Sequence, residues 1–334
     1  MERAVTVTAV LLALAVVLAG CGATQEPAGD GGTTTATTAT GETTTVDGST
    51  TATTTTTAPT TTTAESETST ATDGAEHVGC QPGELEKDGE CTPVLSGSNA
   101  DIFDATDLVA ITTAETTVDG TPGYLARPAE NGTYPAVVMI HEWWGLNDNI
   151  RHMADVLAGH GYVVFAVDLY DGEVTTNASR AGELAGQVRD NPEEAVAKMS
   201  RAVSGLRAMP YTTDAVASLG WCFGGGQSLQ LSLSDADLNA TVVYYGSLVT
   251  DAETLQRVDG PVLGVFGAED TSIPVATVRE FDRTLDEVGV DHEIHVYEGA
   301  PHAFANPSGE RFHPEATRDA WAKTLRFLEE SLRD

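Results

Sequence analysis

The feature that most constrains the fold is a glycine-rich turn between an apolar run and a segment able to form a helix. Residues 215–219 form the apolar run, and residues 220–225 read GWCFGG. Small residues are needed at Gly220 and Gly224 because a side chain there would collide with the neighbouring strand and helix. The stretch predicts a strand, a sharp turn and a helix, with Cys222 at the tip of the turn.

Further apolar runs and amphipathic segments alternate from about residue 102 to the C-terminus. Strands are expected at residues 108–111, 123–126, 136–140, 162–167, 215–219, 241–245, 262–266 and 293–297. Helices are expected around residues 150–157, 192–209, 274–288 and 321–332. The first two strands form an antiparallel hairpin that turns at Asp119-Gly120. The remaining strands and helices predict an α/β fold, a mostly parallel sheet with helices on both faces.

The N-terminal segment has the pattern of an export signal. Residues 4–20 are almost wholly apolar, follow Arg3 and end in LAGC at Cys21, which resembles the lipobox of secreted lipoproteins. The pattern predicts a signal peptide over residues 1–20. The resemblance to a lipobox implies cleavage before Cys21 and a lipid on its thiol. An uncleaved N-terminal helix is the alternative. In either case we expect an exported protein at the cell surface, held at the outer face of the cytoplasmic membrane.

Composition divides the rest of the chain into three parts. Residues 21–76 are rich in threonine and lack the apolar side chains needed for a core, so they are expected to form a disordered stalk. Residues 77–101 form a linker in which Cys80 and Cys91 are expected to pair as a disulfide in an oxidising compartment. Residues 102–334 form the folded domain, whose length suits one α/β domain.

The charge of the chain restricts its partners. There are 50 Asp and Glu residues against 17 Lys and Arg residues, a formal net charge of −33. A surface this acidic argues against nucleic acid or anionic lipid as a partner, so the lipid anchor is the only membrane contact expected. The acidity, the few lysines and the many threonines resemble proteins of salt-loving archaea, and an ordinary acidic secreted protein is the alternative. The sequence determines no oligomeric state.

Cys222 has no disulfide partner in this scheme, so it is either buried and inert or reactive. Asp270 follows the strand at residues 262–266, and His302 follows the strand at residues 293–297. The carboxyl ends of parallel strands meet at one edge of a sheet, so both side chains should lie beside Cys222. His302 would take the thiol proton, and Asp270 would hold the tautomer of the imidazole.

A second turn, HEWWG at residues 141–145, follows another buried strand. The backbone N–H groups of Phe223 and Trp143 are expected to stabilise the oxyanion that forms when a carbonyl is attacked. Glu142 should lie close to Cys222, where its carboxylate could position the thiol or accept its proton before substrate arrives. Packing over the sheet is the alternative role for one of the two tryptophans in this turn.

The segments HEWWG, GWCFGG, FGAED and GAPHAF together resemble the dienelactone hydrolase family of α/β-hydrolases over roughly residues 105–333. The turn at Cys222 resembles the nucleophile elbow of that fold, with cysteine in place of the usual serine. The resemblance implies an α/β-hydrolase fold and a triad of Cys222, Asp270 and His302, with Glu142 as a companion carboxylate. It also implies hydrolysis of a small ester or lactone through an acyl-thioester intermediate, with no metal and no cofactor.

The chain departs from this family in the residues that would bind a substrate carboxylate. Founding members use arginines for this purpose, one of them soon after the catalytic histidine, whereas residues 303–306 read AFAN here. Arg180 and Arg189 cannot be aligned with a substrate role. A muconate-type lactone is therefore not the expected substrate, and the substrate stays unassigned.

Two other functions fit parts of the sequence. A surface binding protein that keeps the fold without activity would be indicated by a missing member of the triad, and none is missing. A redox-active thiol would need a partner, and Cys222 has no C-x-x-C motif.

Asn131, Asn177 and Asn239 each begin an N-x-S/T sequon and are candidate N-glycosylation sites.

Overall fold

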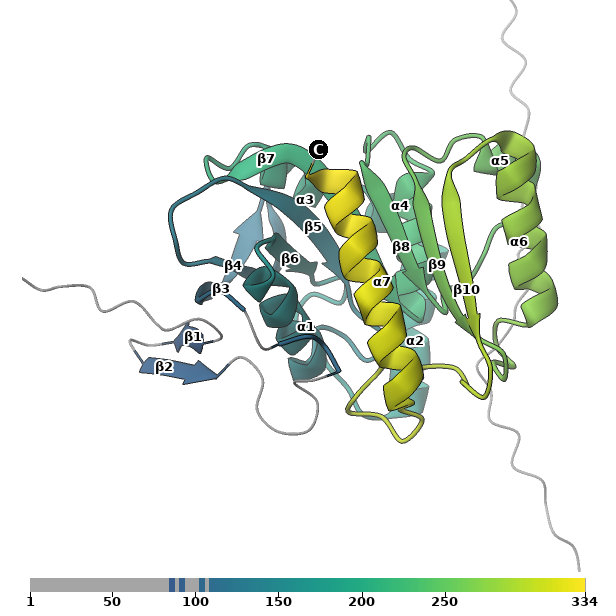
Figure 1. Ribbon diagram of the computed structural model, residues 1–334, viewed down its shortest axis with the longest axis horizontal. Helices are drawn as coiled ribbons and strands as arrows, with labels where there is room; N and C mark the ends of the chain where they lie inside the picture. The colour runs from purple at the N-terminus through teal and green to yellow at the C-terminus, as the bar shows by residue number, and fades with distance from the viewer. Residues whose placement is uncertain (1–83, 88–89, 94–101, 106–107, 334) are drawn as a thin grey trace, which may run out of the picture. The chain divides into compact units, whose positions relative to one another are not determined.

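The computed structural model describes residues 84–87, 90–93, 102–105 and 108–333, which contain a ten-stranded sheet (Figure 1). The strands are β1 (Glu84–Lys87), β2 (Glu90–Pro93), β3 (Ile111–Val118), β4 (Thr121–Pro128), β5 (Tyr134–Ile140), β6 (Val163–Val167), β7 (Thr212–Trp221), β8 (Ala240–Tyr244), β9 (Val262–Gly267) and β10 (His292–Tyr297). Their order across the sheet is β10-β9-β8-β7-β5-β6-β4-β3-β1-β2. From β10 to β6 all neighbours are parallel, and β4 and β3 continue antiparallel. The expected fold class is confirmed.

Helices cover both faces of this sheet. They are α1 (Asp148–Gly159), α2 (Ala178–Asp190), α3 (Pro192–Arg207), α4 (Phe223–Ser232), α5 (Ala252–Leu255), α6 (Val275–Val288) and α7 (Pro314–Leu332). In Figure 1, α1 and α7 lie in front of the sheet and α3 and α4 behind it. The side chains of β5 alternate accordingly: Val137 and Met139 pack into the core under α1 and α7, and Val138 and Ile140 pack into the core under α3 and α4.

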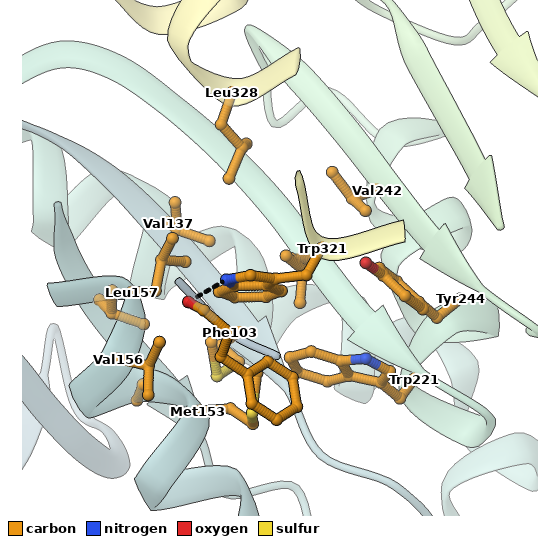
Figure 2. Close-up of a cluster of buried hydrophobic side chains, with 14 of the residues drawn as sticks. Phe103, Val137, Met153, Val156, Leu157, Trp221, Val242, Tyr244, Trp321 and Leu328 are labelled. Atoms are coloured by element: carbon orange, nitrogen blue, oxygen red, sulfur yellow. Dashed lines mark hydrogen bonds between the residues drawn. The ribbon is translucent and has the colours of Figure 1, made fainter. Parts of the chain in front are cut away.

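The larger core joins the two ends of the folded part of the chain (Figure 2). The indole Nε1 of Trp321 in α7 donates a hydrogen bond to the carbonyl oxygen of Phe103, 2.9 Å away. The two rings meet edge to face with their centroids 5.7 Å apart. Both side chains are buried, together with Trp221 at the end of β7 and Tyr244 at the end of β8. The residues around position 103 are therefore part of the core that supports the turn after β7.

The N-terminal hairpin turns where the sequence predicts. Asp119 and Gly120 connect β3 to β4 with positive φ angles of 46° and 77°, which matches the two-residue turns that follow the twist of a hairpin. The strand before the turn lies later than expected, since β3 begins at Ile111 and not at Leu108. Its residues 112–117 are mostly exposed and polar, so no apolar run marks them.

Two further parts of the fold lie outside the sequence-based expectations. α2 buries only three side chains, which is too few to form a recognisable apolar stripe: Ala181, Leu184 and Ala185. β1 and β2 pair antiparallel within the expected linker at residues 77–101, and β1 pairs parallel with β3. Neither strand has a pattern strong enough to stand out in a segment of mixed polarity.

Several predictions concern residues that the structure does not describe. The signal peptide at residues 1–20, the lipidation site Cys21 and the stalk at residues 21–76 lie outside the described residues, as does Cys80. The Cys80–Cys91 disulfide therefore stays a prediction. In the described part of the chain, no helix combines the length and the apolar character needed to cross a bilayer.

The three sequons lie at the surface. Asn131 is exposed in the turn between β4 and β5. Asn177 is exposed at the N-cap of α2, where its side-chain oxygen accepts the Arg180 N–H. Asn239 is exposed before β8, and its side-chain oxygen accepts the Val216 N–H. Their glycosylation stays a prediction.

Candidate active site

One edge of the sheet gathers the loops that carry the predicted site. β5, β7, β8, β9 and β10 are parallel, and in the sheet they follow one another as neighbours. Their carboxyl ends therefore meet at one edge, where an open α/β sheet binds its ligands. The loops that leave this edge contain Glu142 after β5, Cys222 after β7, Asp270 after β9 and His302 after β10.

Cys222 occupies a strained turn between β7 and α4. Its backbone has a φ of 55° and a ψ of −116°, a conformation that residues other than glycine rarely adopt. Its N–H donates to the Tyr244 carbonyl at 3.0 Å, and its own carbonyl accepts the Gly226 N–H at 3.2 Å. These bonds tie the turn to β8 on one side and to α4 on the other. The side chain is partly exposed, so a substrate can reach the thiol.

The glycines beside Cys222 allow this close approach of strand and helix. A Cβ atom at Gly220 would overlap the backbone of Gly224, and one at Gly224 would overlap the carbonyl of Ile140 in β5. The obstacle in both cases is backbone, which cannot turn aside as a flexible side chain could. The collision expected from the sequence is therefore present at both positions.

The structure brings Cys222, His302 and Asp270 into one chain of contacts. The Nε2 atom of His302 lies 3.2 Å from the Cys222 Sγ, and its Nδ1 atom lies 2.7 Å from Oδ2 of Asp270. A carboxylate oxygen only accepts, so Nδ1 carries the proton and Nε2 is left to accept one. That is the tautomer a base needs if it is to take the thiol proton.

Asp270 and His302 are themselves held in place. The second carboxylate oxygen of Asp270 accepts backbone N–H groups from Ser272 at 2.7 Å and Ile273 at 3.0 Å. The Tyr245 ring meets the His302 ring edge to face, with the centroids 5.2 Å apart. The Asp270 side chain is fully buried, and 13% of the His302 side chain is exposed. The imidazole therefore stays partly open to solvent while its orienting carboxylate is shielded from water.

Glu142 lies buried at the same edge, held by Asn306 and not by an arginine. The Asn306 amide nitrogen donates to Oε2 of Glu142. The amide oxygen of Asn306 accepts the Ser308 N–H at 2.9 Å, which turns the amide nitrogen toward the carboxylate. Burial raises the pKa of Glu142 to about 7, against the opposing effects of the Asn306 hydrogen bond and the His302 charge. Glu142 therefore changes its charge near neutral pH.

The two expected oxyanion donors belong to elements that meet at Cys222. Phe223 is the first residue of α4, and the first N–H groups of a helix have no acceptor within it. Trp143 lies in the turn after β5. Among the described residues, its N–H donates none of the backbone hydrogen bonds formed outside helices and strands. The Trp143 side chain packs against the core under α3 and α4. Its ring also contacts the Trp144 ring, with the ring centroids 4.7 Å apart. Packing thus accounts for the Trp143 side chain, and the oxyanion role of its backbone N–H stays a prediction.

Sequence reasoning missed three side chains of this site. In the sequence, Asn306 is only part of the AFAN stretch that lacks an arginine, and Tyr245 is only the last residue of the strand expected at residues 241–245. Burial, followed by the charges of Glu142 and the Cys222 thiolate, holds the pKa of Tyr245 well above its usual value. His141 was part of the HEWWG turn without a role. Each is recognisable only from contacts made by distant loops, although His141 directly follows β5 and Tyr245 directly follows β8.

The two arginines without an aligned role differ in their surroundings. Arg180 forms ion pairs with Glu173 at 2.6 Å and Glu183 at 2.9 Å. Arg189 is exposed, with its guanidinium carbon 5.8 Å from the centre of the Phe223 ring. Among the described residues no group of three or more His, Cys, Asp or Glu side chains could hold a metal ion.

Comparisons with known proteins agree with the α/β fold described above. A model of the dienelactone hydrolase family matches residues 121–332, which include Glu142, Cys222, Asp270 and His302. The chain is 30% identical over 240 residues to a Saccharolobus solfataricus protein provisionally named carboxymethylenebutenolidase, over 61% of this chain and 92% of the relative. It is 32% identical over 217 residues to the protein usf of Aquifex pyrophilus, over 63% and 93% of the two chains. The solved structure named m3DLH is 27% identical with a TM-score of 0.61, over 66% and 99%.

Proposed function

We propose, from the premise that this chain belongs to the dienelactone hydrolase family, that it cleaves a small carboxylic ester or lactone with Cys222 as the nucleophile. Hydrolysis of ester or lactone bonds is the activity of the family to which it belongs. The observation that carries the finer proposal is the chain of contacts from Cys222 through His302 to Asp270. A thiol needs a base to become a nucleophile at neutral pH, and His302 in this series of contacts is such a base.

In the first half of the reaction, Nε2 of His302 takes the thiol proton and the sulfur attacks the carbonyl carbon of the substrate. The C–S bond forms as the carbonyl π pair moves onto oxygen, and the N–H groups of Phe223 and Trp143 stabilise the oxyanion. The oxyanion collapses, the C–O bond to the alcohol breaks, and His302 returns its proton to the leaving oxygen. An acyl-thioester on Cys222 remains; for a lactone, the alcohol stays attached to the acyl group.

In the second half, His302 takes a proton from water, and the hydroxide attacks the thioester carbonyl. The same two N–H groups stabilise the second oxyanion. Its collapse breaks the C–S bond, the acid leaves, and the sulfur regains its proton from His302. Asp270 stabilises the imidazolium in both halves because its carboxylate accepts the hydrogen bond from Nδ1–H throughout.

Glu142 has a supporting role in this proposal. Its pKa of about 7 lets the buried carboxyl hold or release a proton under ordinary conditions. When ionised, it adds negative charge near His302, which stabilises the positive charge that the imidazole gains during the reaction. When protonated, it removes that charge. The rate of thiol activation should therefore depend on pH around neutrality.

The substrate is expected to lack the carboxylate that the founding members bind. The stretch after His302, residues 303–306, contains no arginine here, and the Asn306 amide nitrogen donates to Glu142. Arg180 already forms ion pairs with two carboxylates, those of Glu173 and Glu183. Because Asn306 and Arg180 already have partners within the protein, a neutral ester or lactone fits this site better than a muconate-type lactone does.

The location of the enzyme is also part of the proposal. The apolar segment at residues 4–20, the LAGC sequence at Cys21 and the threonine-rich stalk support a lipoprotein exposed at the surface of a haloarchaeal cell. The mass of the N-terminal peptide from a membrane fraction tests this: a peptide that begins at a lipid-bearing Cys21 supports the anchor, and one that begins at Met1 contradicts it.

Replacing the nucleophile tests the proposed function. Cys222→Ala should reduce hydrolysis of short p-nitrophenyl esters at high salt by at least about 10³-fold, and Cys222→Ser should retain little activity. Equal melting temperatures of the variants and the wild type control for folding. Undiminished hydrolysis by Cys222→Ala would end the proposal. An inactive wild type, tested against a panel of esters and lactones, would favour a surface binding protein that keeps only the fold.

A further inference from the structure

A buried histidine next to Glu142 has a single tautomer that its partners determine. Nε2 of His141 accepts the Leu169 backbone N–H at 3.2 Å, so this nitrogen carries no proton. Nδ1 of His141 lies 2.6 Å from the Glu142 carbonyl oxygen, which can only accept. Nδ1 therefore carries the proton and donates it to that carbonyl. The ring is fully buried, and burial lowers its pKa, so it stays neutral.

The carbonyl that His141 holds belongs to the peptide that carries one of the oxyanion donors. The C=O of Glu142 and the N–H of Trp143 are parts of the same planar peptide unit, and in a trans peptide they point in opposite directions. Fixing the carbonyl therefore fixes the direction of the N–H. The Gly145 N–H donates to the same carbonyl at 3.3 Å, so two donors restrain this peptide from one side.

A rotation of this peptide would reverse its effect on the reaction. Turning the peptide by half a turn would direct the Glu142 carbonyl oxygen to the place of the Trp143 N–H. A lone pair would then face the developing oxyanion, where a donor is needed. The rotated form would also leave the His141 Nδ1–H buried without its acceptor, which costs free energy. His141 thus favours the orientation in which the N–H serves the reaction.

The His141 ring also contacts the other expected donor residue. It stacks on the Phe223 ring with the centroids 5.8 Å apart and an interplanar angle of 22°. It meets the Tyr170 ring edge to face, with the ring centroids 4.6 Å apart. One buried side chain therefore connects the turn after β5, the first residue of α4 and the loop after β6.

We propose that His141 is the positioning residue of the oxyanion hole, because it orients the Glu142–Trp143 peptide through the Glu142 carbonyl. The inference rests on the proposed function. His141 touches neither substrate nor thiol in this role, and it exchanges no proton during the reaction. Its effect is confined to steps in which a carbonyl oxygen gains negative charge.

Two reactions of Cys222 separate this role from general support of the fold. Ester hydrolysis passes through an oxyanion. Alkylation by iodoacetamide does not, because the sulfur displaces iodide directly from carbon. His141→Phe keeps a ring and loses the donor, and it should lower kcat for p-nitrophenyl ester hydrolysis by about 10²–10³-fold with little change in KM. The rate constant for alkylation of Cys222 should stay within about twofold of the wild type, because no oxyanion forms in that reaction.

Two further variants complete the test. His141→Asn can place an amide donor near the position of Nδ1, and it should recover part of the lost kcat. His141→Leu replaces His141→Phe if the larger ring prevents folding, which the melting temperature reports. Hydrolysis and alkylation that fall together would overturn the inference, since the side chain would then support the whole turn and not the oxyanion hole.

The inference and the proposed function fail in different ways. If Cys222→Ala abolishes hydrolysis while His141→Phe and His141→Leu leave it unchanged, the inference is wrong and the proposed function stands. If hydrolysis persists in Cys222→Ala, the proposed function is wrong and the inference falls with it.

Discussion

Among the single residues of the site, Glu142 is an acid whose pKa its surroundings bring close to neutral pH. The carboxyl is buried, which raises its pKa to about 7 although an amide donates to it and the His302 ring lies nearby. An acid whose pKa is higher in the folded state than in the unfolded chain binds more protons when folded. Folding stability therefore falls as pH rises from the ordinary glutamate value to about 7.

Glu142→Gln should remove this pH dependence. Between pH 4 and pH 8 the free energy of unfolding of the variant relative to the wild type should rise by about 3 kcal/mol, because the neutral amide keeps the shape of the acid and never ionises. Urea unfolding at a series of pH values measures the difference. Glu330→Gln, on the exposed side of α7, should leave the pH dependence unchanged. A constant difference between Glu142→Gln and wild type would show that Glu142 titrates in its ordinary range.

The sequence predicted the residues of the contact chain better than the residues that support it. Cys222, Asp270 and His302 each follow a predicted strand, so topology alone brings them to one edge. Asn306 and Tyr245 became part of the site only through packing. Their partners lie on loops after other strands, and no spacing in the sequence shows which loop will fold over which.

Among the elements, β7 and α4 determine the position of the Cys222 thiol. The strand runs directly into the helix, and the glycines between them let the helix lie against β5 and β8. The first residue of α4 follows Cys222, so the helix begins, with its free N–H groups, directly beside the thiol-bearing residue. The position of the nucleophile is a consequence of this close packing.

Substitutions of glycine in two helices should have opposite effects. Gly224→Ala in α4 should lower the free energy of unfolding by roughly 3 kcal/mol or more and reduce activity, because its methyl group meets the Ile140 carbonyl. Gly186→Ala in α2 has open space around the new methyl group, and it should raise the free energy of unfolding by roughly 0.5–1 kcal/mol. Urea unfolding of both variants tests this. A mild effect at Gly224 would mean that α4 can move away from β5 without loss.

The elements that the sequence did not predict are those without an apolar signature. α2 buries one leucine and two alanines, and the middle of β3 is exposed on both faces. Periodicity detects an element through the side chains it buries, so elements that bury few go unseen. The buried strands β5, β6, β8 and β9, by contrast, lie close to their expected positions.

At the scale of the whole molecule, acidity dominates. The formal net charge of −33 places like charges close together in the folded state and farther apart in the unfolded chain. Salt shortens the range of this repulsion from about 10 Å at 0.1 M to about 3 Å at 1 M. Screening should therefore stabilise the folded state more than the unfolded one.

The melting temperature should rise steeply with KCl concentration between 0.1 M and 2 M at neutral pH, because screening removes the repulsion. Near pH 4, where roughly half of the carboxylates are protonated, the same increase in salt should produce a smaller rise. Calorimetric scans at both pH values make the comparison. An equal rise at both would assign the effect to salt exclusion from the surface and not to screening.

The sequence by itself determined the order of the elements, the fold class and the three residues that the contact chain joins. It could do so because buried strands and glycine-rich turns leave local patterns, and parallel strands bring their ends to one edge. Only the tertiary structure decided what holds these residues. Asn306 meets Glu142 across 164 positions and Leu169 meets His141 across 28, so the charge of one group and the tautomer of the other depend on loops that the chain brings together only on folding.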